Sequence, residues 1–208
     1  MARHIGPVCR LCRREQVKLF LKGDKCYTKC VLDKRPTPPG VAKPQRGKPS
    51  EYAIRLREKQ KLRRLVLMTE RPFERLYQRA TKATGRTGEA LLRYLECRLD
   101  NVCRRLGYST SIKGSRQLVA HGHVKVNGRY VNIPAYEVAP GDLIQLDPGL
   151  KENVNVKLSL DTAARKSTRP SFFEFDEATL TAKMVREPSR EECPFPVTEQ
   201  LIVEYYSK

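Results

Sequence analysis

The stretch Lys113-Gly-Ser-Arg-Gln-Leu-Val-Ala-His-Gly122, followed by His123-Val-Lys-Val-Asn-Gly-Arg-Tyr-Val-Asn-Ile133, decides the fold of this chain. Its first part predicts a short helix that ends at Gly122, because glycine favours the left-handed conformation of a helix C-cap. In its second part, Asn127-Gly128 stands between two runs of alternating apolar and polar residues, which is the strongest local signal for a β-hairpin. The stretch therefore predicts a helix that leads directly into an antiparallel hairpin.

Further helices and strands are indicated on both sides of this stretch. Upstream, leucine and valine recur at helical spacing over residues 92–106, so we expect one long helix there. Downstream, Pro140-Gly-Asp142 predicts a turn, and Leu143–Leu146 alternates as a third strand. We expect two more strands at Leu158–Leu160 and Phe172–Phe175.

The region before this module predicts two amphipathic helices. Ser50 is a suitable N-cap for a helix over residues 50–65. Thr69 is the matching N-cap for a second helix, whose apolar residues recur between Phe73 and Ala80. The apolar end of the chain, Thr198–Tyr206, is expected to be ordered. Helices combined with a small antiparallel sheet indicate the α+β class.

Positive charge is concentrated in the first half of the chain. Residues 1–97 carry 25 Lys and Arg against 9 Asp and Glu, whereas residues 98–208 carry 16 against 14, within a net charge of +18. A one-sided positive field of this size fits a polyanion, and nucleic-acid phosphate is the usual one. Only 39% of the residues are hydrophobic, so the basic half has few side chains with which to build a core.

Composition argues against a membrane protein or a secreted one. The chain has no apolar run of about 18 residues that would span a bilayer, and its N-terminal residues lack the apolar stretch of a signal peptide. We therefore expect a cytoplasmic protein with no membrane partner. Because that compartment keeps thiols reduced, the seven cysteines are not expected to form disulfides.

Four cysteines near the N-terminus have the spacing of a metal site. Cys9 and Cys12 form one close pair, Cys26 and Cys30 form another, and 13 residues separate the pairs. Zinc favours four soft ligands in a tetrahedron, and its binding orders segments that lack a core. We expect one structural Zn²⁺ on these four thiols. The alternatives are four unrelated reduced thiols and a redox Cys-x-x-Cys, which lacks here the βαβ context that it normally has.

Two basic segments follow the cysteines. The Pro-rich segment 36–49 predicts an extended linker, kept positive by Lys43, Arg46 and Lys48. The helix at residues 50–65 carries six cations, although a freely solvated helix gains stability by interleaving the two signs. We interpret this helix as a phosphate-binding surface rather than a merely solvated face.

Some residues invite a catalytic interpretation, which their surroundings do not favour. Arg98-Leu-Asp100 resembles the triplet around the catalytic aspartate of pseudouridine synthases, but it lies in a leucine-patterned helix with no large catalytic sheet after it. We expect its Arg and Asp to lie on the helix surface and to bond locally or to RNA. His121 and His123 lack partners for metal or acid–base chemistry. We therefore expect neither catalysis nor a small-molecule substrate.

Taken together, these motifs resemble a known RNA-binding module. Residues Arg98–Gly107, Arg116–His123, Val126–Gly128 and Gly141-Asp142 are similar to the module named after small-subunit ribosomal protein S4. RNA-modifying enzymes and a tRNA synthetase carry this module as well. The similarity to the bacterial S4 family, in its zinc-bearing type, extends over essentially the whole chain through Ile5–Arg14, Lys22-Gly23, Pro38–Gly40, Ser50–Tyr52, Leu56–Leu62 and Glu199–Ser207.

The resemblance implies a structural component of the small ribosomal subunit. Members of this family bind small-subunit rRNA at a helix junction, nucleate assembly, contact ribosomal protein S5 and other small-subunit proteins, influence decoding accuracy and help line the mRNA entry channel. The implied α+β fold has a zinc-bound segment (1–35), a basic linker (36–49), a helical domain (50–97, with 191–208 packed on it) and a helix-helix-hairpin RNA-binding module with its extension (98–190).

Two departures from the family pattern concern the helix before the hairpin. Ile112 cannot donate a hydrogen bond to phosphate, and Gly114 costs about 0.5–1 kcal/mol of helix stability. Two other functions are possible, namely an RNA-modifying enzyme that carries the same module and a zinc-ribbon DNA-binding regulator. The residues expected to bind RNA are Arg3, Arg10, Arg13, Arg14, Lys22, Lys43, Arg46, Lys48, Tyr52, Arg55, Arg57, Lys59, Lys61, Arg63, Arg64, Arg98, Arg105, Lys113, Arg116, His121, His123 and Lys125.

Overall fold

The computed structural model describes residues 4–41, 48–165 and 169–207. The chain divides into two compact units: a first unit of residues 1–91 and 194–208, and a second unit of residues 92–193. In the described part of the chain, no helix is long and apolar enough to cross a membrane.

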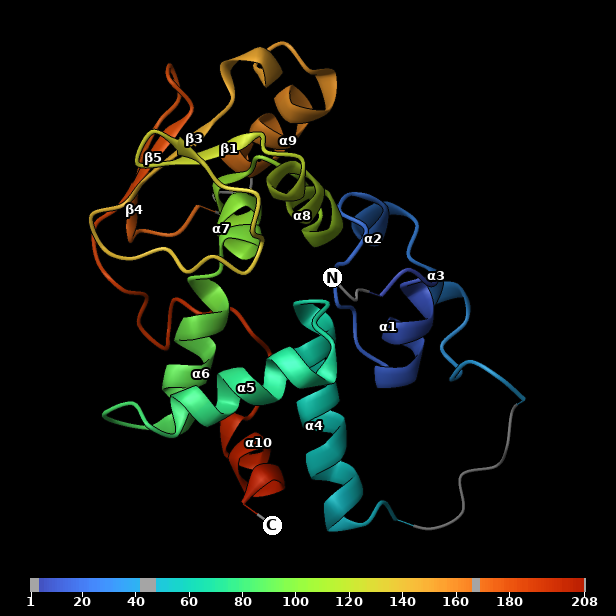
Figure 1. The fold of residues 1–208 in the computed structure, drawn as a ribbon. Helices are drawn as coiled ribbons and strands as arrows, with labels where there is room; N and C mark the ends of the chain where they lie inside the picture. Colours follow the sequence, from blue (N-terminus) through green and yellow to red (C-terminus); the bar gives the residue numbers. More distant parts are fainter. Residues whose placement is uncertain (1–3, 42–47, 166–168, 208) are drawn as a thin grey trace. The chain divides into compact units, whose positions relative to one another are not determined.

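The first unit is helical. Three short helices, α1 (Cys9–Glu15), α2 (Lys25–Thr28) and α3 (Val31–Lys34), precede the longer α4 (Glu51–Leu65) and α5 (Glu70–Ala80), and α10 (Glu199–Tyr206) ends the chain (Figure 1). The expected N-cap of α4 is confirmed, because Ser50 Oγ accepts a hydrogen bond from the Ala53 amide at 3.2 Å. Thr69 precedes α5 without such a bond.

Helix α10 packs against α4, although about 140 residues of sequence separate them. The core of this unit is built from fully buried side chains of α4, α5 and α10, namely Leu62, Phe73, Ala80 and Ile202. The C-terminal segment therefore supplies apolar surface that the basic first half of the sequence lacks.

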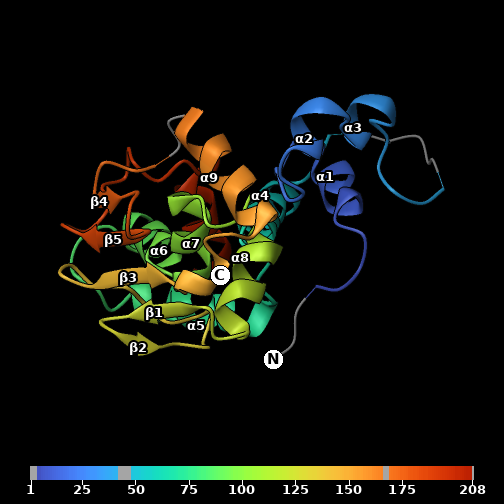
Figure 2. The ribbon, with the colours of Figure 1, turned by 90° about the horizontal axis from the view of Figure 1, so that it is seen from above.

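The second unit contains a five-stranded antiparallel sheet in the order β2-β1-β3-β5-β4 (Figure 2). The confirmed hairpin consists of β1 (Val124–Val126) and β2 (Arg129–Tyr130). Both residues of its turn have positive φ, 50° at Asn127 and 79° at Gly128, as a type I′ turn requires. The other strands are β3 (Leu143–Leu146), β4 (Phe173–Asp176) and β5 (Thr181–Met184), so the expected strands at 143–146 and 172–175 are confirmed.

One face of this sheet is covered by helices. Helices α7 (Leu99–Leu106), α8 (Ile112–Ala120) and α9 (Val154–Arg165) contribute to a single apolar cluster with the inward side chains of the sheet. Its buried members include Val102, Leu106, Val119, Ile144 and Met184. The alternate residues of each strand point to the opposite face, which these helices leave uncovered.

Two sequence-based predictions about this unit are wrong. The long helix expected over residues 92–106 is two helices, α6 (Thr87–Glu96) and α7, with Arg98 in extended conformation between them. The break is stabilised by a bridge between Arg98 and Glu137, and the Leu99 amide donates to the Tyr136 carbonyl at 2.8 Å. Leu158–Leu160, expected as a strand, lies inside α9, where local helical hydrogen bonding overrides a short apolar alternation.

Candidate RNA-binding surface

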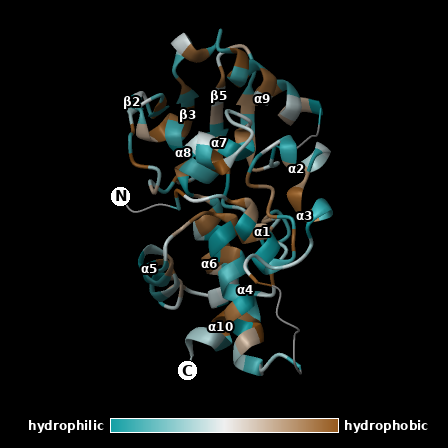
Figure 3. Ribbon diagram, turned by 90° about the vertical axis from the view of Figure 1, so that its right-hand side faces the viewer, coloured by the Kyte–Doolittle hydropathy of each residue, from teal (hydrophilic) through white to brown (hydrophobic). Residues whose placement is uncertain are grey.

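The basic helix α4 carries cations that are already paired inside the protein. Figure 3 shows hydrophilic colour along much of α4. All six cations of this helix that were expected to bind phosphate have a carboxylate within ion-pair distance: Arg55 pairs with Glu51 and Glu204, Arg57 and Arg64 with Glu15, Lys59 and Arg63 with Glu70, and Lys61 with Glu58. The helix is therefore a centre of ion pairing, which its sequence, with two acidic residues, did not indicate.

Lys59 differs most from its expected role. Its side chain is only 4% exposed, its ammonium lies 2.6 Å from Glu70 Oε1, and it stands 4.4 Å above the centre of the Tyr205 ring. Tyr206 donates a hydrogen bond to the same Glu70 oxygen at 2.9 Å. Burial raises the pKa of Glu70, but the hydrogen bonds from Lys59 and Tyr206 outweigh it, and the pKa lies below its ordinary value. The group connects α4, α5 and α10 rather than presenting a cation to RNA.

Glu15 forms a second buried acidic centre. Its side chain is 1% exposed and lies between Arg57 and Arg64, so it joins α1 to α4. Burial raises the pKa of Glu15, and the two guanidinium groups oppose this shift. Within the first unit, charge pairing therefore holds α1 against α4.

Arg98 and Asp100 are also structural. The Arg98 side chain is 8% exposed and donates twice to the Asp100 carboxylate, from Nη2 at 2.8 Å and from Nε at 3.1 Å. Arg116 of α8 approaches the same carboxylate at 3.5 Å. The expectation that these two residues bond locally is confirmed. The expectation that they lie on the helix surface is wrong, because the break before α7 turns both of them inward.

Arg105 makes a comparable internal contact. It donates from Nε to Glu96, whose side chain is completely buried, and Asn101 donates from its amide to the same carboxylate. A buried carboxylate needs such partners, because an uncompensated charge in the interior is very costly. Glu96 thus fixes the corner between α6 and α7, and it also holds the guanidinium of Arg105.

Several exposed cationic side chains of the second unit lie on α8 and the hairpin. Ser111 caps α8 by accepting from the Gly114 amide at 3.1 Å. Lys113, His121 and Lys125 follow along α8 and β1, with Lys113 and His121 exposed. His123 lies 3.8 Å from Asp147. Arg129 and Tyr130, both exposed on β2, were missed by the sequence analysis, although their position beside the hairpin turn could have indicated exposure.

The expected site residues of the N-terminal segment fall into three groups. Arg10, Arg14, Lys22 and Lys48 are exposed. Arg13 instead donates to the backbone carbonyls of Thr37 and Pro38, so it holds the start of the linker. Arg3, Lys43 and Arg46 lie outside the described residues.

The four N-terminal cysteines interact electrostatically. Cys12 and Cys26 are buried, whereas Cys9 and Cys30 are half-buried. Burial raises the pKa of the Cys12 thiol, a hydrogen bond from the Leu19 backbone lowers it, and Cys26, Cys9 and Cys30 raise it further. The Lys22 amide donates to Cys26 Sγ at 3.3 Å. Across residues 4–41, 48–165 and 169–207, no group of three or more His, Cys, Asp or Glu side chains has a geometry that would hold a metal ion.

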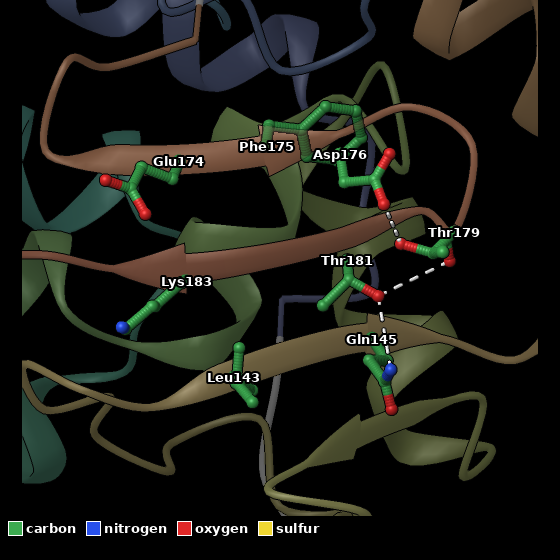
Figure 4. Close-up of a pocket in the computed structure, with 8 residues that line it drawn as sticks. All are labelled: Leu143, Gln145, Glu174, Phe175, Asp176, Thr179, Thr181 and Lys183. Atoms are coloured by element: carbon green, nitrogen blue, oxygen red, sulfur yellow. Dashed lines mark hydrogen bonds between the residues drawn. The ribbon is translucent and has the colours of Figure 1, made fainter.

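Hollows of the described surface occur in both units. One, of about 480 Å³, lies on the uncovered face of the sheet, where Gln145 of β3, Thr181 of β5 and Asp176 of β4 point to the same side (Figure 4). The Thr179 hydroxyl and the Ala178 amide keep the pKa of Asp176 below its usual value, so this carboxylate caps a turn. The other, of about 490 Å³, belongs to the first unit and is lined by Tyr52, Arg55, Glu70, Glu74, Tyr205 and Tyr206.

The chain matches known proteins over its whole length. Residues 3–96 match the family model of the ribosomal protein S4/S9 N-terminal domain, and residues 97–144 match that of the S4 domain. The chain is 51% identical to small ribosomal subunit protein uS4A of Symbiobacterium thermophilum, 49% identical to uS4 of Acidobacterium capsulatum and 47% identical to uS4 of Thermus thermophilus, each over 100% of both chains.

Proposed function

The chain belongs to the ribosomal protein S4 family, and from this premise we propose that it is a structural constituent of the small ribosomal subunit that binds small-subunit rRNA. The observation that carries this conclusion is the full-length identity of about half the residues with relatives named as small ribosomal subunit proteins. The finer roles follow from the same membership: binding at a helix junction, early nucleation of assembly and an influence on decoding accuracy.

The mode of binding that the residues support is contact with the RNA backbone from several surfaces. RNA helices offer little base readout in their narrow major groove, so phosphate and ribose contacts dominate. Lys113, His121 and Lys125 supply such contacts from the second unit, and Arg10 and Lys22 supply them from the first. The internal pairs of Arg98 and Arg105 keep the α6–α7 corner rigid, so the cations of α8 are held in place before RNA arrives.

The protein is not an enzyme. An RNA-modifying enzyme with the same module would need a reactive carboxylate, whereas Asp100 is 1% exposed and is occupied by Arg98. The relatives that the chain matches over their entire length are ribosomal proteins. A competition experiment separates this function from that of a DNA-binding regulator. Duplex DNA should displace rRNA from a DNA-binding regulator but should fail to displace it from this protein.

We infer one structural Zn²⁺ on Cys9, Cys12, Cys26 and Cys30. The three other thiols act electrostatically on Cys12, but the described positions do not form a ligand set, so the four thiols would have to move together when the ion binds. Two backbone amides, of Leu19 and Lys22, already donate to Cys12 and Cys26, and such donors stabilise thiolate ligands. When bound, the ion would supply the cross-link that orders residues 4–35, where few apolar side chains are buried. Metal analysis of the purified protein tests this inference, with Cys9→Ser as the variant that should lose the ion and Cys97→Ser as the variant that should keep it.

Protein partners are proposed for the hollow of the first unit. The acidic Glu70 and Glu74 stand there beside Tyr52 and Tyr205, which suits a basic side chain of a neighbouring protein better than phosphate. We assign this hollow to ribosomal protein S5, the partner that the family resemblance implies. The mRNA entry channel is assigned to the basic linker, of which Lys48 is the exposed member within the described residues.

The proposed function is tested by direct binding. The full chain should bind a transcript of small-subunit rRNA and sediment with small ribosomal subunits. If about ten phosphates are contacted, the logarithm of the affinity should fall steeply and linearly with the logarithm of the salt concentration. Binding that is indifferent to salt, or that duplex DNA displaces as readily as rRNA, would refute the proposal.

A further inference from the structure

The edge strand β2 exposes an aromatic ring beside a lysine ammonium. The strand has two residues, Arg129 and Tyr130, both exposed, and Tyr130 is 61% exposed to solvent. Tyr130 is the direct cross-strand partner of Lys125, whose ammonium stands 4.6 Å from the centre of the Tyr130 ring. The ring is therefore held in place by its neighbour, yet most of its surface is open.

The positive charge next to this ring has no carboxylate partner within the described part of the chain. Neither Lys125 nor Arg129 has a carboxylate within ion-pair distance among the described residues. In contrast, Arg98, Arg105 and the cations of α4 all do. An uncompensated ammonium beside an exposed ring forms a surface, here called the hairpin platform (Lys125 and Tyr130), that suits an anionic ligand with a flat ring. Arg129 is the cross-strand partner of Val126 and belongs to the other face, so it adds positive charge to the edge strand but does not flank the ring.

The sheet also limits where such a ligand can lie. One row of outward side chains runs across the strands from Tyr130 through Lys125, Gln145 and Thr181 to Asp176, as the strand register requires. Figure 4 shows the far end of this face, where Asp176 and Glu174 of β4 stand beside β5. The face carries Lys125 and Tyr130 at the hairpin end and two carboxylates at β4, one of them opposite Lys183 of β5, so a polyanion is attracted more strongly to the hairpin end.

We propose that Tyr130 stacks on an unpaired base of bound RNA while Lys125 holds a phosphate next to that base. Every base has a π-face, and single-stranded RNA is bound by aromatic rings set among cations. A base within a double helix has no free face, so the nucleotide must come from a loop, a bulge or a single strand. This inference rests on the proposed RNA-binding function and adds to it a contact with a base.

A structural role for the ring would give a different result. Tyr130 and Lys125 form a cross-strand pair, and such pairs support a short hairpin whether or not RNA is present. Tyr130→Val keeps a residue suited to a strand but removes the ring, whereas Tyr130→Phe keeps the ring and removes the hydroxyl. Leu143→Thr is the matched control, since Leu143 is also exposed on this face, at 42%, but lies on β3, two strands from Tyr130.

The experiment compares the full-length wild-type protein and these variants in binding to a transcript of small-subunit rRNA, with oligouridine as a competitor. We expect Tyr130→Val to bind the rRNA about 5- to 100-fold more weakly, the range for loss of one stacked base, while Tyr130→Phe and Leu143→Thr bind like wild type. Oxidation of the Tyr130 ring by hydroxyl radicals, read by mass spectrometry, should fall when rRNA is bound. Competition by oligouridine at the platform would identify a free single strand, such as mRNA, as a second source of the base.

The outcomes separate this inference from the proposed function. If wild type binds the rRNA and Tyr130→Val binds equally well with its thermal unfolding unchanged, the stacking contact is refuted and RNA binding stands. If Tyr130→Val unfolds, the oxidation readout on wild type decides, and an unprotected ring overturns the inference. Protection in assembled subunits but not in the protein–rRNA complex would assign the ring to a protein partner. If wild type itself fails to bind the rRNA, the proposed function fails as well.

Discussion

Removal of the Asp100 carboxylate should destabilise the second unit severely. Asp100 is 1% exposed and accepts two hydrogen bonds from Arg98, itself 8% exposed, and a longer one from Arg116. In Asp100→Ala the Arg98 guanidinium would remain buried without the carboxylate to which it donates two hydrogen bonds. Such an uncompensated charge costs about 3–5 kcal/mol, a large part of the stability of about 5–15 kcal/mol typical of a folded protein.

The comparison that isolates this cost uses two further variants. In Arg98→Met/Asp100→Leu both charges are replaced by apolar groups, and most of the lost stability should return because no unpaired ion remains. Glu89→Ala removes a carboxylate from the Arg86–Glu89 pair, in which Arg86 is 86% exposed. That exposed pair should contribute less than about 0.5 kcal/mol.

The assay is urea unfolding, with hydrogen exchange of the amides in residues 99–146 to follow the second unit separately from the first. We expect Asp100→Ala to lower the free energy of unfolding of these amides by about 3 kcal/mol or more, with little change in residues 51–80. An effect below about 1 kcal/mol, or a double variant no more stable than Asp100→Ala, would refute the argument that the pair is a buried structural ion pair.

Three other predictions follow from local features. Gly107→Ala should lower the free energy of unfolding, measured by heat or urea, by about 2–4 kcal/mol, because a Cβ there would meet Ala163 Cβ at 2.5 Å. Gly141→Ala, at a similar φ of +94° but with open space around it, should lower it by only about 1–2 kcal/mol. Equal losses in the two variants would contradict the steric reasoning. Burial raises the pKa of Cys97 and Cys193 to about 12 and that of Cys103 higher still, so iodoacetamide at mildly alkaline pH should label these thiols only after unfolding, and rapid labelling in the folded protein would disprove their burial. The pKa of Glu70 lies below its ordinary value of 4.5, so the stability that its carboxylate contributes is present above pH 4.5 and is lost as pH falls through the lowered pKa. Glu70→Gln should therefore lose less stability than wild type on acidification. If both proteins lose the same stability, the Lys59–Glu70–Tyr206 group is not coupled to folding.

The parts of the fold that sequence predicted well are those with strong local signals. Ser50, the Asn127-Gly128 turn and Gly122 act through the conformation of their own backbone or through hydrogen bonds a few residues away, and each is found where it was expected. The break at Arg98 depends instead on backbone bonds with residues 134–138, about 37 residues later. No helical periodicity carries that information, so the regular leucine spacing predicted one helix where there are two.

The candidate surface was harder to predict for the same reason. The cost of Gly114 was judged from helix propensity, but a Cβ at this position would meet Ser109 Oγ at 2.1 Å. Glycine therefore allows the loop before α8 to approach the helix closely, and this contact is invisible in the sequence. Likewise, Tyr130 could be placed next to the hairpin turn, but the printed chain does not reveal that its ring stands beside an unpaired ammonium.

The net charge of +18 therefore overstates the charge available to RNA. A cation paired with a buried carboxylate, such as Arg64 with Glu15 or Arg105 with Glu96, has little freedom to move to a phosphate, because its departure would leave the carboxylate buried without a partner. Exposed cations such as Arg10, Lys22 and Arg129 carry no such cost. Counterion release reports the phosphates actually contacted, so the salt dependence of rRNA binding should follow the exposed cations and not the total. Replacing Arg129 should reduce the salt dependence of rRNA binding, whereas replacing Arg105 should leave that dependence unchanged and lower the stability of the protein.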